Sequence, residues 1–109
     1  MLFVLAAAFA LNFPLAWAES EHLPQAIQHT KAAITHGEAG HPPVLVEHAS
    51  TALTHAEASK KAEANPHTAE GVTHLQAAID AGKKGDAPSG TAHARQALEH
   101  LELAKPKKG

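Results

Sequence analysis

The chain has 109 residues, a formal net charge of −2 and no cysteine. This length allows one domain, the lack of cysteine excludes disulfides and thiolate chemistry, and no concentrated basic stripe of the kind that binds nucleic acid is present. The ten histidines outnumber the nine lysines and arginines together. Histidine is therefore the residue type whose placement carries the most information.

Residues 1–18 have the pattern of a secretory signal peptide, an apolar run that ends in an A-x-A cleavage motif at residues 16–18. A membrane anchor is the alternative. Asn12 and Pro14 interrupt the run, however, and about 20 apolar residues are normally needed to span a bilayer. We expect cleavage and export to the periplasm, no stable membrane association afterwards, and a mature domain over residues 19–109.

Four helical segments are predicted after this leader, at about residues 20–36, 42–64, 66–81 and 88–104. In the first, Ile27 and Ile34 belong to an apolar stripe with helical spacing. In front of the third, Asn65 and Pro66 are predicted as the N-cap and the first helical residue. Alanine fills much of each inner face, so the core is expected to be thin.

The second half of the chain repeats the first at an offset of 45 residues, so that Pro43 matches Pro88, and Gly37 and Gly40 match Gly82 and Gly85. Gly37 and Gly82 are predicted to end their helices. Short turns between similar helices indicate antiparallel neighbours. The predicted fold is all-α, an up-down-up-down antiparallel four-helix bundle built from two repeated hairpins, 20–64 and 66–104. We expect it to be a monomer.

Histidines recur every seven residues within the helices. Seven residues make about two helical turns, so each run lies along one side of its helix. Residues equidistant from the turn of an antiparallel hairpin lie level with each other. The ten histidines then form five predicted pairs: His22–His55, His29–His48, His36–His41, His67–His100 and His74–His93.

Paired imidazoles are candidate ligands for divalent metal ions. Successive histidines on one helix are about 10.5 Å apart along the axis, too far to share an ion through bonds of about 2.0–2.1 Å. A site must therefore join two helices or use a local carboxylate. Glu70 is the best such carboxylate because it lies between His67 and His74 on the same helical face; Glu38, in the first turn, is another. The candidate metal ligands are His22, His29, His36, His41, His48, His55, His67, His74, His93, His100 and Glu70.

Imidazole and carboxylate ligands suit Cu(II), Ni(II) and Zn(II), and the usual affinity order places Cu(II) first. The alternative is a solvated histidine face, because His29 and His36 lie roughly opposite Ile27 and Ile34 on a helical wheel. The chain would then be a structural or adaptor bundle with a histidine-based pH response. An enzyme is not expected, because no nucleophile set beside a base, no phosphate loop and no closed three-ligand zinc site is recognisable.

With these motifs the chain resembles the small metal-binding protein (SmbP) family of periplasmic, histidine-rich bacterial proteins. The resemblance is carried by the His-x6-His runs, the turn from His36 to His41 with its two glycines, and the Ala-(Ile/Leu)-x-His units. It implies a four-helix bundle that binds several divalent ions, copper prominently, and a role in copper handling. Ala81 and Asp86 stand where the pattern calls for another histidine pair, so the family's stoichiometry is not carried over.

Overall fold

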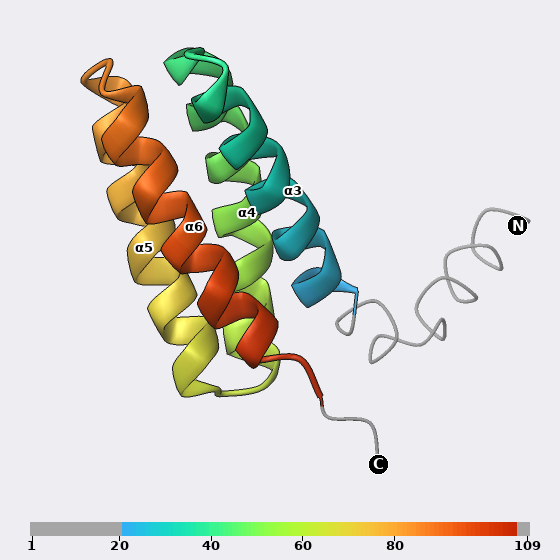
Figure 1. The fold of residues 1–109 in the computed structure, drawn as a ribbon. Helices are drawn as coiled ribbons and strands as arrows, with labels where there is room; N and C mark the ends of the chain where they lie inside the picture. Colours follow the sequence, from blue (N-terminus) through green and yellow to red (C-terminus); the bar gives the residue numbers. More distant parts are fainter. Residues whose placement is uncertain (1–20, 107–109) are drawn as a thin grey trace, which may run out of the picture.

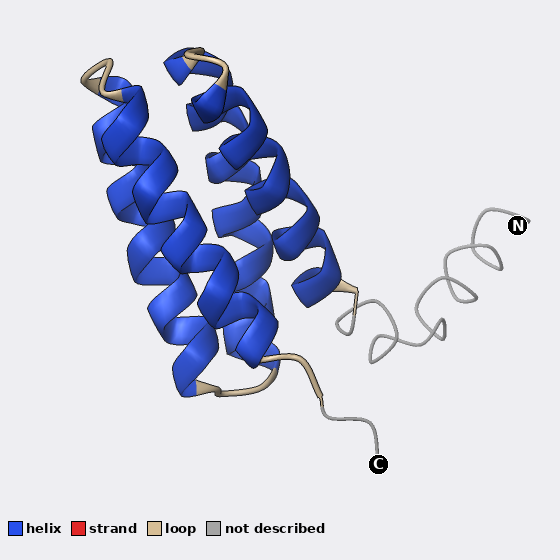
Figure 2. Ribbon diagram, in the orientation of Figure 1, coloured by secondary structure: helices blue, strands red, loops and turns tan. Residues whose placement is uncertain are grey.

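The computed structural model describes residues 21–106, and the predicted leader, residues 1–18, lies outside this range. The described part contains four helices and no strand: α3 (His22–Glu38), α4 (Pro42–Ala62), α5 (Pro66–Lys83) and α6 (Ala87–Leu103). The turns α3–α4 and α5–α6 lie at one end of the molecule, and the α4–α5 connection lies at the other (Figures 1 and 2). Each helix packs mainly against two others, in the order α3, α4, α5, α6 and back to α3, and α4 also makes a smaller diagonal contact with α6. The predicted four-helix bundle is confirmed.

Proline and side-chain caps set where the helices begin. Proline occupies the first turn of α4, α5 and α6. A backbone N–H in the first turn has no acceptor within the helix, so proline, which lacks this N–H, costs no hydrogen bond there. The carboxamide oxygen of Asn65 accepts a hydrogen bond from the backbone N–H of His67 at 2.8 Å, which confirms the predicted N-cap. Asp86 accepts in the same way from the backbone N–H of Ser89 at 3.0 Å.

The prediction that Gly37 and Gly82 end their helices is wrong. Both are buried, and each helix continues one residue further. The left-handed conformation that the turns need occurs at Gly40 and Gly85, each with φ of 79°. Two glycines three residues apart are therefore used for different purposes, and only the second of each pair reverses the chain.

Gly37 and Gly82 instead allow close approach between helices. A Cβ atom on Gly37 would collide with the Thr91 hydroxyl and lie 2.6 Å from Leu45 Cδ1. One on Gly82 would lie 2.5 Å from Val46 Cγ2. Because a real Cβ cannot come this close to other heavy atoms, any larger residue would force the helices apart.

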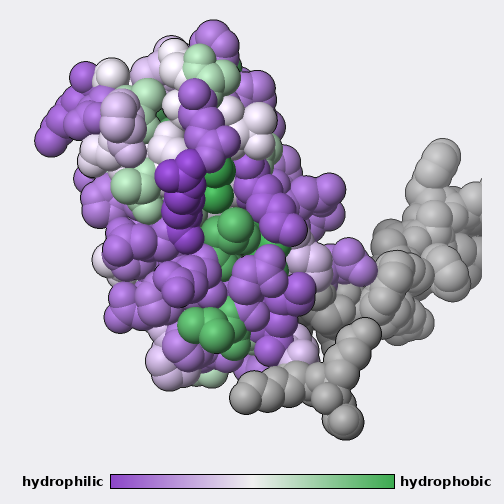
Figure 3. Space-filling model, in the orientation of Figure 1, coloured by the Kyte–Doolittle hydropathy of each residue, from purple (hydrophilic) through white to green (hydrophobic). Residues whose placement is uncertain are grey.

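The core is built from small side chains around a few leucines. The largest fully buried residues are Leu45, Leu75 and Leu101, and eight alanines surround them with no exposed surface: Ala26, Ala33, Ala49, Ala52, Ala56, Ala78, Ala94 and Ala97. On the face seen in Figure 3 the surface is mostly hydrophilic, and the most hydrophobic residues form a narrow, interrupted band along the middle of the view. Within residues 21–106, no helix combines the length and apolarity needed to cross a bilayer.

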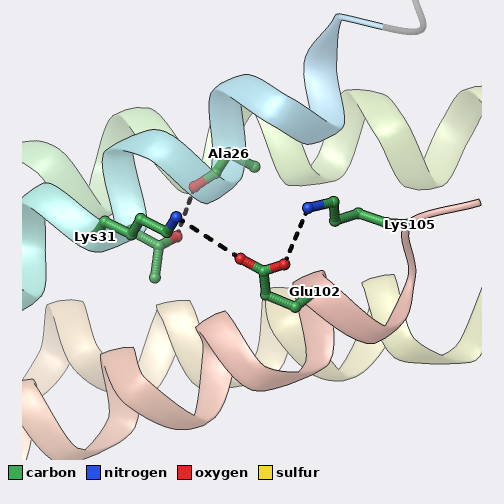
Figure 4. Close-up of polar contacts among 5 residues, drawn as sticks. Ala26, Lys31, Glu102 and Lys105 are labelled. Atoms are coloured by element: carbon green, nitrogen blue, oxygen red, sulfur yellow. Dashed lines mark hydrogen bonds and ion pairs between the residues drawn. The ribbon is translucent and has the colours of Figure 1, made fainter.

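Exposed ion pairs join α3 to α6 across the two hairpins. Lys31 Nζ lies 3.8 Å from one carboxylate oxygen of Glu102, and Lys105 Nζ lies 3.1 Å from the other (Figure 4). Arg95 pairs with Glu38, so the carboxylate considered from sequence as a turn ligand bonds to a guanidinium. Such exposed pairs typically contribute less than about 1 kcal/mol each.

Candidate metal centre

The histidines of the first hairpin form a continuous column of imidazole rings along the seam between α3 and α4. We call it the first column; its rings follow the order His22, His55, His29, His48 and His36, with adjacent centroids 5.1, 6.1, 5.7 and 5.3 Å apart. Successive rings come alternately from α3 and α4, and all five are partly buried. The predicted contacts His22–His55 and His29–His48 are present. The contact His29–His55 links these two pairs, and the contact His36–His48 adds His36 at the end of the column.

The second hairpin carries a shorter column between α5 and α6. This second column follows the order His67, His100, His74 and His93, with adjacent centroids 5.5, 5.7 and 5.9 Å apart. Both predicted contacts of this hairpin are present, and His74 also stacks on His100 with an interplanar angle of 7°. The two hairpins therefore repeat the same interleaved arrangement.

Helix geometry explains the interleaving. The rise of about 10.5 Å between histidines seven residues apart leaves room for one ring from the facing helix between them. A seven-residue step rotates by only about 20° around a straight helix, so successive histidines stay close to one seam. This seam lies beside the core, which is why the rings are partly buried and face each other although the wheel places them away from the isoleucines.

Ring nitrogens in three of the cross-helix pairs already lie at coordinating separation. Two ligand atoms on one ion, with bonds of about 2.0–2.1 Å, are about 2.8 Å apart at a right angle and about 4.2 Å apart when opposed. The observed Nδ1–Nδ1 distances are 2.9 Å for His22–His55, 3.5 Å for His29–His48 and 3.3 Å for His67–His100. At these separations an ion could join the two nitrogens of each pair with little rearrangement of the backbone.

The predicted pair His36–His41 is the exception. His36 stacks on His48, at an interplanar angle of 5°. His41 is the N-cap residue of α4, with non-helical backbone angles, and is exposed. Equal distance from the turn predicts a level pair only where both residues are helical, and His41 lies just outside its helix.

Glu70 lies beside the second column. Ligand atoms of Glu70, His74 and His100 all lie within 4.8 Å of one another. From sequence we expected Glu70 to act with His67 and His74, but the third donor of this cluster comes from α6. The i, i+4 spacing of Glu70 and His74 was visible in the sequence; the half-step offset that brings His100 between His67 and His74 was not.

Two further features concern single rings. His93 Nδ1 is buried without a hydrogen-bond partner, so a metal ion or other ligand that bonded to this nitrogen would satisfy a buried polar atom.

The pKa of His55 is lowered from its ordinary value by burial first, and then by the positive charges that His22 and His29 carry when protonated. A lowered pKa keeps this imidazole neutral, and so able to bind a cation, to more acidic pH.

The chemistry of these columns is that of neutral nitrogen donors, supplemented in one place by a carboxylate. A family model described as small metal-binding protein matches residues 1–104, a range that includes all ten histidines. The chain belongs to the small metal-binding protein family. None of the curated proteins matches it. Membership of the small metal-binding protein family and the cluster of Glu70, His74 and His100 together support metal binding, and point to a binding protein rather than a catalyst.

Proposed function

We propose that this protein binds divalent metal ions in the periplasm, with Cu(II) preferred over Ni(II) and Zn(II), and that it sequesters, buffers or delivers them. The observation that carries the proposal is the convergence of ring nitrogens from facing helices to 2.9–3.5 Å. Placement in the periplasm rests on the leader pattern of residues 1–18. The choice of copper rests on the affinity order of divalent ions for nitrogen and oxygen ligands.

Sequestration and delivery fit the exposure of the sites. The column histidines are partly buried, and Glu70 is exposed, so ions can enter and leave without local unfolding. No ligand in either column is a thiolate or thioether. Ions held by a few imidazoles at a helix seam exchange more easily than ions in an enclosed cage, which suits a buffer.

The cluster of Glu70, His74 and His100 is the site that we expect to fill first. Among residues 21–106, these three side chains bring three potential ligand atoms, one of them a carboxylate oxygen, within 4.8 Å of one another. The first column offers imidazoles alone. A carboxylate adds an anionic donor, and a hard oxygen ligand beside nitrogen suits Cu(II) and Zn(II). The first ion should therefore have one oxygen and two nitrogen donors from the protein.

Calorimetric titration of the mature protein with Cu(II), at pH 7.5 and at pH 5, tests the proposal. We expect several ions per chain at pH 7.5 and much weaker binding at pH 5, because protonated imidazole is no longer a ligand. Parallel titrations with Ni(II) and Zn(II) rank the metals. Electron paramagnetic resonance at limiting Cu(II) reports the donor atoms of the first site. The absence of binding heat at pH 7.5 for all three metals would remove the proposal.

A pH-responsive adaptor bundle is the second candidate, and the lowered pKa of His55 favours it. In this function, protonation of the columns at acidic pH drives the rings apart, and metal plays no part. It predicts a reversible change in helicity between pH 7.5 and 5.5 with a chelator present and no effect of added Cu(II) at either pH. Circular dichroism under these four conditions separates the two candidates.

A further inference from the structure

Most rings in the two columns have two neighbours rather than one. In the first column, His29 contacts both His48 and His55, and His48 contacts both His29 and His36. A neutral imidazole has one lone pair, so it binds one ion at a time. Neighbouring pairs therefore compete for the ring that they share.

We propose that each column binds ions through non-overlapping pairs of adjacent rings, so that position within the column, and not the number of histidines, sets its capacity. This inference rests on the proposed metal-binding function. It follows from the alternating order of the rings, and it goes beyond the five independent pairs that the sequence pattern indicates. Its consequences differ between the two columns because one has five rings and the other has four.

The first column has more than one way to bind two ions. One arrangement uses His22 with His55 and His29 with His48, and leaves His36 free; another uses His55 with His29 and His48 with His36, and leaves His22 free. Moving from one to the other requires each ion to exchange one ring for the next. The spare ring therefore lets ions shift along the seam by single-ligand steps, without leaving the protein.

The second column has a single arrangement for two ions, His67 with His100 and His74 with His93. The cluster with Glu70 uses His74 and His100, the two inner rings, and leaves the outer rings unpaired at opposite ends. A first ion in this cluster must give up one imidazole before the column can accept a second. Binding of the second ion should therefore be weaker than binding of the first.

The rule makes an asymmetric prediction for the first column. The rings from α3 occupy its two ends and its centre, and removing any one of them leaves two separate adjacent pairs: this holds for His22, His29 and His36. The rings from α4 occupy the second and fourth positions. Removing either His48 or His55 leaves one isolated ring and a run of three rings, which can hold only one pair. Histidines of α3 are individually dispensable for capacity, and those of α4 are not.

The variants His29→Ala and His48→Ala provide the test and its matched control. Both rings are partly buried, both have two ring neighbours, and they face each other across the seam. Both variants carry His41→Ala in addition, so that the exposed ring cannot substitute for a lost one. Copper bound per chain is measured by elemental analysis after saturation at pH 7.5 and removal of free metal. Helicity by circular dichroism establishes that each variant is folded.

We expect His29→Ala to bind as many ions as the His41→Ala parent and His48→Ala to bind one fewer. A second measurement uses His22→Ala and His36→Ala, which should each retain the parent's capacity and together lose one ion. If the parent binds no copper, the proposed function itself fails. If the parent binds copper but His29→Ala loses as much as His48→Ala, or more, metal binding survives and the pairing rule is overturned.

Discussion

Leu45 and Gly90 occupy equivalent positions in the two repeated halves, and they meet in the folded core. A Cβ atom built on Gly90 would lie 3.2 Å from Leu45 Cδ1 and 3.3 Å from the carbonyl oxygen of Ala78. One half supplies a large side chain and the other supplies none, so together they fill one space in the first turns of α4 and α6, at the end of the bundle that carries the α3–α4 and α5–α6 turns. Exact repetition of leucine at both positions would not fit.

The first prediction concerns substitution of these two residues, singly and together. Leu45→Ala alone removes a fully buried side chain and should cost about 2–5 kcal/mol of unfolding free energy. Gly90→Leu alone should cost about 1–3 kcal/mol through overpacking. The double variant should be more stable than the sum of the two losses implies, because the new leucine enters the vacated space. Urea unfolding of the four proteins measures this coupling, and strict additivity would show that the two positions do not share one space.

Much of the fold was predictable from sequence because local signals and the repeat agree. Proline and Asn65 marked the helix starts, and short glycine-containing turns implied antiparallel hairpins. The roles of Gly37 and Gly40 were not separable, since either can adopt positive φ and only the packing of Leu45 and Thr91 shows which one must lack a side chain. Such a distinction depends on tertiary contacts that no local pattern encodes.

The site was predictable to the level of pairs, and not beyond it. A seven-residue repeat and a turn define which residues lie level, and this was sufficient for His22–His55 and His67–His100. The diagonal contacts, such as His36 with His48, depend on how far the facing helices are shifted along their axes. That shift comes from core packing. The same shift brings His100 to Glu70 and His74, which explains why the sequence pattern alone grouped this carboxylate with His67 and His74 and did not include His100.

Neutralising Glu70 should weaken the first site selectively. Glu70→Gln keeps the size of the side chain but removes the anionic donor from the cluster with His74 and His100. We expect about tenfold weaker binding of the first Cu(II) ion, equivalent to about 1.4 kcal/mol, with little change at later sites. Glu99→Gln is the control, because Glu99 is also exposed and lies next to His100 in sequence but outside the cluster. An equal effect of both substitutions would indicate general electrostatic attraction and not ligation.

Metal should stabilise the bundle. A ligand that binds only the folded state, at a free concentration one hundred times its dissociation constant, adds about 2.7 kcal/mol per site. For a domain of this size each kcal/mol raises Tm by about 4–8 °C. Thermal unfolding followed by circular dichroism, with and without Cu(II), should show a rise of this order that EDTA reverses. A Tm unaffected by saturating Cu(II) would mean that the ions bind the unfolded chain equally well, so that the folded columns contribute nothing to affinity.

Acidification should destabilise the metal-free protein, in part through His55. Burial and the neighbouring charges of His22 and His29 lower the pKa of His55 in the folded state, so between the folded and unfolded pKa values the unfolded chain binds more protons. The free energy of unfolding therefore falls as pH drops below the ordinary value of 6.5 and continues to fall until the folded pKa is passed. Urea unfolding in EDTA at pH 7.5, 6.5 and 5.5 measures the loss. His55→Ala should lose less stability over this range than the unsubstituted protein, whereas His41→Ala, which removes an exposed ring outside the columns, should follow it closely. A steeper loss of stability in His55→Ala would contradict the assigned direction of the pKa shift.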